Sequence, residues 1–263
     1  MAENVLDTTT TLRISLGTTM TKRSRAPGVP NMLLAALPRE DYVSLLDEAE
    51  VIELKLRDVL NEPGDPPSYV YFPSSGVISM LTLLDDGSAV EIATIGNEGM
   101  TDIAAYLGVE SPARWLVQVP GEALRIKADT LRAMAEKLPH LLSVMHNYML
   151  AMFILVSQTA ACNRKHPVEE RCARWLLMTH DRVEGDEFPM THDFLADMLG
   201  VRRPSVSIAM AMLSRADFIG YRRGKVTLRD RRGLEAAACE CYDVIRSVFD
   251  ARFPVSPHLS AAI

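Results

Sequence analysis

The chain has 263 residues, of which 48% are hydrophobic and 24% are charged, and its net charge is −6. This composition excludes a disordered chain and a disulfide scaffold, and the length fits two domains that each bury a core. The four cysteines lie in the second half of the chain, without the paired C-x-x-C spacing of a zinc ribbon. We therefore expect reduced thiols in a reducing compartment, with no metal site and no cofactor.

The N-terminal segment, residues 1–30, is polar, and it contains no apolar stretch of the kind found in secretory signals. We predict a flexible tail there and a cytoplasmic protein. Helical patterns follow at residues 31–37 and 41–48.

Residues 51–126 consist of short alternating or apolar runs, separated by turn sequences such as Asp86-Gly87 and Pro120-Gly121. Many short strands at this spacing predict an antiparallel sandwich or barrel, and we expect a jelly-roll-like β domain over residues 31–137. The strands are expected at residues 51–57, 69–72, 77–84, 89–95, 115–119 and 123–126.

A long helix is predicted next, over residues 138–165. Residues 138–163 contain no Asp, Glu, Lys or Arg, and an uncharged stretch of that length can span a bilayer. Polar residues such as His146, Asn147 and Gln158 are spread through it, which favours a soluble helix and no membrane partner.

Apolar residues of this helix recur at seven-residue spacing with an offset of four, which indicates a heptad seam for a partner helix. Its other faces are also apolar, so the helix needs cover on more than one side; a central core helix in a monomer is the alternative. We expect a homodimer with contacts at Leu141, Met145, Tyr148, Met152, Leu155 and Thr159.

Charge is distributed unevenly along the chain. Residues 200–233 hold nine basic and two acidic residues, a local charge of +7, so the remainder carries −13. A basic region in an acidic protein is typical of a site for a polyanion, because binding releases counterions from phosphates. A merely solvated charged face is the alternative if charge is considered alone.

The basic region carries two short helical patterns. The first is capped by Thr191 and ends at Gly200, a residue suited to a left-handed turn. The second has Pro204 in its first turn, where the missing N–H is tolerated, and turns one apolar face inward. Strand-like runs at 218–221 and 225–229 follow, joined by Arg222-Arg223-Gly224. This order predicts a helix-turn-helix with a basic β-hairpin wing.

Three sequence blocks resemble the Crp/Fnr superfamily of bacterial transcription regulators: HPVEERCARWLLMTHDRV at 166–183, THDFLADMLGVRRPSVS at 191–207, and YVYFPSSGVISM at 69–80. The resemblance covers residues 31–250. It implies an α+β chain with a cyclic-nucleotide-binding-like jelly roll, a dimerisation helix at 138–165, and a winged helix-turn-helix at 166–250 before a tail at 251–263. The implied partners are a second copy of the chain and double-stranded DNA, with RNA polymerase as a further candidate.

Carried onto this sequence, the family pattern places a base-reading residue at Arg203. Pro204 stands where many members have a glutamate, and Ile208 where they have a groove-facing arginine, so the operator should differ from the usual half-sites. We expect His192 to meet a DNA phosphate. The full set of expected DNA contacts is Thr191, His192, Arg202, Arg203, Ser205, Ser207, Ile208, Arg222, Arg223 and Lys225.

The β domain departs from nucleotide-binding members of the family, which carry a Gly-Glu-x-Gly phrase and then an Arg-Ser pair for the cyclic phosphate. Here the first phrase reads Gly96-Asn97-Glu98-Gly99, and Ser111-Pro112-Ala113 replaces the pair, without an arginine. We predict no response to cyclic AMP, and the effector stays unknown. The expected effector pocket is Gly96, Asn97, Glu98, Gly99, Met100, Ser111 and Arg114.

Other functions compete with transcription control. A nucleotide-gated regulatory subunit would share the β domain but would lack the basic helix-turn-helix. Haem binding through His140 or His146 and redox sensing by the cysteines are further alternatives. An iron–sulfur sensor of this family would need N-terminal cysteines, and Cys239 and Cys241 should lie on opposite sides of a helix. We find no nucleophile–base pair or phosphate loop and expect no enzyme.

Overall fold

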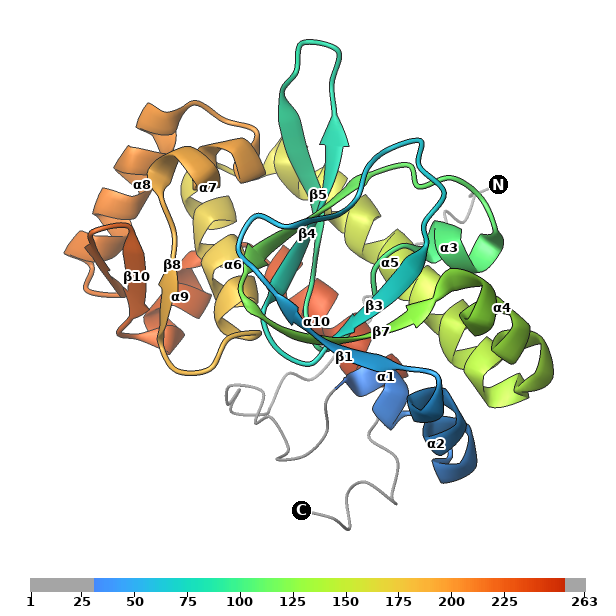
Figure 1. The fold of residues 1–263 in the computed structure, drawn as a ribbon. Coiled ribbons are helices and arrows are strands. Elements are labelled where there is room, and N and C mark those ends of the chain that lie inside the picture. Colours follow the sequence, from blue (N-terminus) through green and yellow to red (C-terminus); the bar gives the residue numbers. More distant parts are fainter. Residues whose placement is uncertain (1–30, 254–263) are drawn as a thin grey trace, which may run out of the picture.

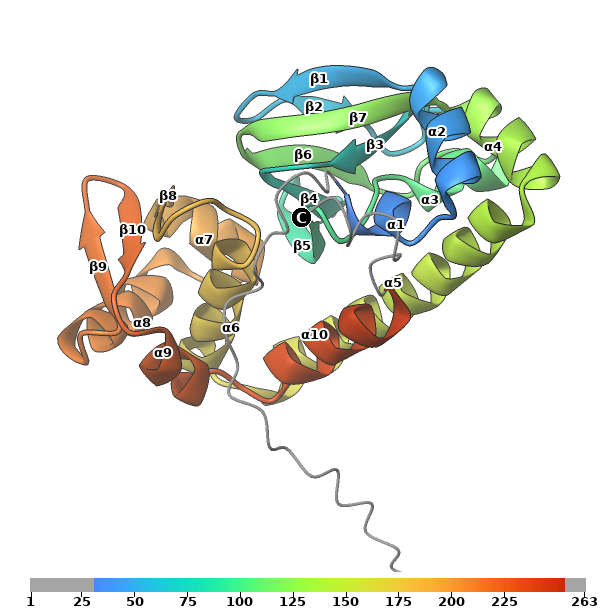
Figure 2. The same ribbon diagram turned by 90° about the horizontal axis from the view of Figure 1, so that it is seen from below.

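The computed structural model describes residues 31–253. The predicted tail at 1–30 and residues 254–263 of the predicted C-terminal tail lie outside the described residues. The β domain rests on one side of a long helix, and the C-terminal unit lies near the other end of that helix (Figures 1 and 2). The α+β class and the predicted order of jelly roll, long helix and winged helix-turn-helix are confirmed.

Two antiparallel sheets form the β domain. One sheet has the order β1-β7-β3 and the other β2-β6-β4-β5. Alternation along the strands turns residues such as Phe72, Ile78 and Val117 inward, and their side chains are almost fully buried between the sheets. The bounds are β1 Glu50–Leu54, β2 Val59–Asn61, β3 Tyr69–Pro73, β4 Val77–Leu83, β5 Ala89–Ile95, β6 Arg114–Val119 and β7 Gly121–Lys127.

Six of these strands fall where the sequence predicts them. Strand β2 was not predicted, because three residues are too few to show an alternation and its pairing with β6 shifts register between Val59 and Asn61. Four helices surround the sheets, of which only the first two were predicted by residue range. They are α1 Met32–Ala35, α2 Arg39–Asp47, α3 Ile103–Leu107 and α4 Ala128–Lys137.

Helix α5, Pro139–Lys165, runs along the β domain and ends near the C-terminal unit (Figure 2). The six predicted dimer contacts are all buried within the chain itself, from Tyr148 at 0% exposed to Thr159 at 7%. The β domain and a C-terminal helix cover this side of α5, so the chain's own core occupies the face that the sequence assigned to a partner, and the homodimer stays a prediction. The exposed large hydrophobic side chains of the helix are Phe153, 71% exposed, and Leu150, 47% exposed.

The covering C-terminal helix is α10, Cys241–Arg252, which runs back along α5 (Figure 2). Phe253 follows it and is buried, with its ring centroid 6.5 Å from that of Tyr148. Residues 241–253, which the sequence divided between the DNA-binding unit and a tail, therefore pack on the long helix. Among the described helices α5 alone is long and apolar enough to cross a membrane, but one face of it belongs to the chain's own core.

The C-terminal unit consists of α6, the helix-turn-helix pair α7 and α8, a small sheet of order β8-β10-β9, and α9. Strand β8 was not predicted; it pairs with the wing strand β10 from Lys225 to Thr227. The bounds are α6 Val168–His180, β8 Glu187–Pro189, α7 His192–Leu199, α8 Arg203–Arg215, β9 Ile219–Arg222, β10 Lys225–Leu228 and α9 Arg231–Ala237.

Candidate DNA interface and effector region

The helix-turn-helix forms for the local reasons that its sequence predicts. The Thr191 side chain caps α7 by accepting from the backbone N–H of Phe194 at 3.2 Å. Gly200 ends α7 with a φ of 61°, a left-handed conformation that glycine adopts without a steric penalty. Pro204 lies in the first turn of α8. Val206, Ala209, Met210 and Leu213 are buried, which fixes the opposite face of α8 toward solvent.

The exposed face of α8 begins with two arginines and continues as an apolar surface. Arg202 and Arg203 are exposed at the helix start, and Ile208 is 59% exposed one turn later. The Arg203 Nε atom lies 3.1 Å from Asp193 Oδ1, with both side chains about two-thirds exposed. An exposed ion pair of this kind contributes little, so Arg203 can exchange it for a base or phosphate.

The wing is a two-residue hairpin between β9 and β10. Arg223 and Gly224 at its tip both have positive φ, 51° and 74°, as turns of this hairpin class require. Arg222 and Arg223 are exposed. Lys225 lies 2.7 Å from Glu187 on β8, so its charge is partly balanced within the protein.

His192 and Ser207 connect the two helices and the wing. The Nδ1 atom of His192 lies 3.0 Å from Ser207 Oγ, and its ring stacks on Tyr221 with centroids 4.5 Å apart. Burial, reinforced by Arg203, lowers the pKa of His192. The ring thus packs against the wing, and the phosphate contact of His192 stays a prediction. Ser205 is half-buried in the first turn of α8.

The Gly96–Gly99 segment packs against side chains from other parts of the protein. Arg182, after α6, forms a buried ion pair with Glu98, at 2.6 Å from its Nη2 to Oε1. A Cβ at Gly96 would collide with Arg182, and one at Gly99 would collide with Tyr148. Tyr148 also donates from its hydroxyl to the Met100 carbonyl at 2.5 Å. The Asn97 carbonyl accepts from the backbone N–H of Met32.

The remaining predicted pocket residues are engaged locally. Ser111 donates to the Ala113 carbonyl at 3.0 Å, and Arg114 pairs with Glu62 at 2.8 Å on the surface. None of the seven predicted residues lines a cavity of about 340 Å³ in the described part of the chain. That cavity lies between the β domain and α5 and is lined by Met80, Asp102, Ile103, Ala104, Pro112, Trp115, Met149, Met152, Phe153 and Val156.

Two family models match the chain in the order of its domains. The cyclic nucleotide-binding domain matches residues 51–137, and the Crp-like helix-turn-helix domain matches residues 170–237. The chain belongs to the Crp/Fnr superfamily of transcription regulators. No curated protein sequence is similar enough to count as a match.

Solved structures share the fold of this Crp/Fnr chain at low sequence identity. FixK2 from Bradyrhizobium japonicum is 17% identical with a TM-score of 0.61, covering 73% of this chain and 98% of its own. The c-di-GMP-responsive regulator CLP from Xanthomonas campestris is 16% identical with a TM-score of 0.58, covering 73% and 99%. A CRP/FNR family regulator from Thermus thermophilus is 20% identical with a TM-score of 0.59, covering 72% and 98%.

A buried polar network joins the two domains of this Crp/Fnr chain. The Trp175 indole on α6 donates to Glu91 Oε1 on β5 at 2.8 Å, and the Ser79 hydroxyl lies 2.7 Å from the other carboxylate oxygen. Gln118 donates to Thr179 at 3.4 Å in the same region. Burial raises the pKa of Glu91 to about 7, against the lowering effect of these hydrogen bonds. Sequence analysis missed this network because its members are far apart along the chain.

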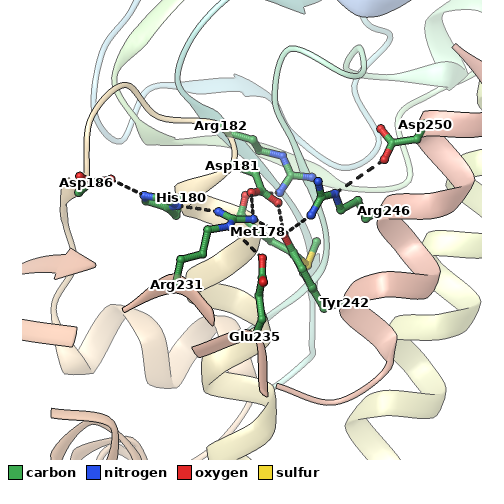
Figure 3. Close-up of polar contacts among 10 residues, drawn as sticks. All are labelled: Met178, His180, Asp181, Arg182, Asp186, Arg231, Glu235, Tyr242, Arg246 and Asp250. Atoms are coloured by element: carbon green, nitrogen blue, oxygen red, sulfur yellow. Dashed lines mark hydrogen bonds and ion pairs between the residues drawn. The ribbon is translucent and has the colours of Figure 1, made fainter. Parts of the chain in front are cut away.

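A second polar cluster joins α6, α9 and α10 (Figure 3). The Arg231 guanidinium on α9 donates to Asp181 at 2.7 Å, to Glu235 at 2.9 Å and to the Tyr242 hydroxyl at 2.6 Å. Tyr242 in turn donates to Asp181 at 2.8 Å. The cluster therefore holds α10 to the DNA-binding unit as well as to α5.

Four potential metal ligands also meet near the end of α5, which corrects the placement expected for Cys239 and Cys241. They are Cys162, His166, Cys239 and Cys241, whose ligand atoms all lie within 4.8 Å of one another. Cys239 and Cys241 are not on opposite sides of a helix, because the backbone is extended at Ala238 and α10 begins only at Cys241. The sequence shows no C-x-x-C pair because two segments far apart supply the four side chains.

Proposed function

We propose that this chain is a sequence-specific transcription regulator that binds double-stranded DNA as a homodimer in the cytoplasm. The observation that carries the proposal is the surface formed by the start of α8 and the wing. Arg202, Arg203, Arg222 and Arg223 are exposed there, while the inward face of α8 is buried. A helix presented in this way fits the major groove, and basic residues on both sides of it suit the phosphates.

The proposed reading of DNA divides between base and backbone contacts. We propose that Arg203 forms a bidentate contact to guanine and that the apolar side chain of Ile208 contacts the thymine methyl group. Arg222 and Arg223 on the wing suit phosphates, which carry affinity but no sequence information. RNA polymerase stays a predicted partner.

The proposed dimer uses the exposed face of α5. Leu142, Met149, Phe153 and Val156 repeat at heptad spacing, one residue later than the seam predicted from sequence, and all are partly or largely exposed. Leu150 widens this apolar strip. An apolar strip of this kind on a helix that is otherwise packed needs a partner, and a second copy of α5 would supply it.

The proposed effector pocket is the 340 Å³ cavity, which the strip on α5 borders through Met149 and Phe153. Asp102 is the one ionisable residue that lines it, and burial raises the pKa of its carboxyl to about 6. An anionic cyclic phosphate would meet no arginine there and would face this carboxyl group. The pocket therefore favours a largely apolar effector, one that is neutral or carries a hydrogen-bond donor.

Cyclic AMP is accordingly expected to bind weakly. Loss of a charge-assisted contact to a buried phosphate costs about 2–5 kcal/mol, a factor of tens to thousands in affinity. Titration calorimetry with the full chain tests this, and low-micromolar affinity for cyclic AMP would contradict it. Asp102→Asn, which removes the carboxylate, should raise any residual affinity.

Selection from random DNA tests the proposed function directly. We expect a palindrome whose half-sites are centred about one helical turn apart and pair a G with T-rich positions. Arg203→Ala should weaken the selected site by about 1–3 kcal/mol and relax the preference at that G, whereas Arg223→Ala should weaken all sequences alike and flatten the salt dependence. Arg132→Ala, which changes a partly exposed arginine of the β domain, is the control. No enriched sequence would refute the proposal, and equal loss on specific and random DNA would refute base reading by Arg203.

A further inference from the structure

Three cysteines and one histidine from distant parts of the chain converge where the two domains join. Cys162 lies in the last turn of α5 and His166 caps that helix, while Cys239 lies in the connection from α9 to α10 and Cys241 begins α10. The Sγ atoms of Cys162 and Cys239 are 3.5 Å apart, and Cys241 Sγ is 3.5 Å from His166 Nδ1. All four ligand atoms lie within 4.8 Å of one another.

We propose that Cys162, His166, Cys239 and Cys241 bind a single zinc ion in tetrahedral coordination. Three thiolates and one imidazole are an established structural zinc set, and zinc–sulfur bonds of about 2.3 Å separate neighbouring ligands by roughly 3.8 Å. The observed separations need only small side-chain movements to match this geometry. An iron–sulfur cluster places several iron and sulfide atoms between its thiolates, so it needs a wider arrangement.

Two neighbours are placed as supporting groups for a metal site. His166 Nε2 lies 3.3 Å from Glu240 Oε1, which directs the other ring nitrogen, Nδ1, toward the cysteines. Metal-bound histidines commonly donate their second nitrogen to a carboxylate in this way. Gln158 Nε2 donates to Cys241 Sγ at 3.1 Å, a contact that would stabilise a thiolate there.

Buried positive charge surrounds the same cluster. Arg171 and Arg174 on α6 are 6% and 4% exposed, and within the described residues their Nε atoms have no hydrogen-bond partner. Both arginines interact electrostatically with the thiols of the cluster. Three thiolates and one divalent ion leave a net negative charge, which a buried guanidinium can balance. Zinc binding releases the thiol protons to solvent, so its apparent affinity rises with pH.

The site lies where a bound ion would hold the long helix and the DNA-binding unit in one relative orientation. The chain passes between the long helix and the DNA-binding unit at the α5–α6 junction and returns through the α9–α10 connection (Figure 2). One ion bound by both passages fixes the direction of α6, and with it the helix-turn-helix, relative to α5. This consequence for DNA binding rests on the proposed function; the metal site itself does not.

Metal analysis of the full-length wild-type chain is the first test. Elemental analysis should find one zinc per chain, and apo-protein titrated with Co²⁺ should develop thiolate-to-cobalt charge-transfer bands and the visible bands of tetrahedral cobalt. Absence of both, a Cys162–Cys239 disulfide in the freshly purified protein, or iron accompanied by acid-labile sulfide would overturn the proposal.

Variants separate the site from general effects on folding. Cys162→Ala and Cys239→Ala should lose the zinc, and Glu240→Gln should weaken its binding about 10–100-fold. Cys172→Ala is the matched control, because Cys172 is equally buried but packs against Met210 away from the cluster. Equal loss of zinc in Cys172→Ala would overturn the assignment of these ligands. Should Cys162→Ala or Cys239→Ala fail to fold, the cobalt titration of the wild type decides alone.

Limited proteolysis with trypsin tests, without DNA, whether zinc holds the α5–α6 junction in place. Arg164 and Lys165 are exposed at the α5–α6 junction, and removal of zinc should accelerate cleavage there several-fold, with recovery on adding zinc back. DNA binding should weaken in parallel. Unchanged cleavage and unchanged DNA binding in the apo-protein would refute the proposal that zinc fixes the direction of α6 relative to α5. Zinc binding in a protein that binds no DNA would refute the proposed function and leave the metal site standing.

Discussion

Charged side chains are exposed at the start of α8 and on the wing, but they are buried and paired at the Gly96–Gly99 loop. Arg202, Arg203, Arg222 and Arg223 are exposed, and within the described residues only Arg203 has an ion pair, a solvent-screened one. In the loop, Glu98 is buried in a pair with Arg182, which reaches it from the DNA-binding unit. The four exposed arginines remain available to a polyanion, whereas the Glu98–Arg182 ion pair joins the two domains. The same fold thus keeps one charged surface for a ligand and uses the other as structure.

Arg182→Met tests this contrast with the largest expected effect. Removing one partner of a buried ion pair leaves the Glu98 charge uncompensated, and the free energy of unfolding should fall by about 3–5 kcal/mol. Urea denaturation measures it. Arg222→Ala on the wing should change stability by less than about 0.5 kcal/mol. Similar losses in both variants would remove the distinction between the two regions.

Phe153→Glu sharpens the comparison between the two faces of α5. A charge at the centre of the exposed apolar strip should weaken dimerisation by about 2–4 kcal/mol, or roughly 30- to 1,000-fold, and should leave the monomer folded. Sedimentation velocity and circular dichroism measure the two properties. Asn147→Glu is the control, because this residue points about 120° around the helix axis from Phe153 and lies outside the apolar strip. A wild-type chain that is monomeric at micromolar concentration would contradict the dimer.

Glu91→Gln tests the buried network between the domains through pH. The folded-state pKa of about 7 is above the ordinary 4.5, so the folded chain holds this proton while the unfolded chain loses it. Stability of the wild type should therefore fall as the pH rises from about 4.5 to 7 and then level off.

Glu91→Gln should lack this pH-dependent part of the free energy of unfolding, which amounts to up to about 3 kcal/mol. Urea denaturation across the pH series gives the difference between the two proteins, and Glu62→Gln on the surface is the control. An identical pH dependence in wild type and Glu91→Gln would show that Glu91 ionises normally.

Prediction from sequence succeeded where neighbouring residues fix the structure. Thr191 caps α7, Gly200 ends it, and Arg223-Gly224 forms a tight turn, because each depends on backbone geometry within a few residues. Both faces of α5 are apolar, so the sequence could not show which of them the packing of α10 and the β domain covers.

The sequence by itself determined the order of domains, the α+β class, the inward face of α8 and the basic character of its start and the wing, since alternation, helical periodicity, caps and local charge are all short-range properties. Only the tertiary structure decided the use of Glu98, the stacking of His192 on Tyr221, and the meeting of Cys162 with Cys239. These contacts join residues up to 84 positions apart. No local spacing encodes such a meeting, because it arises from how whole elements pack.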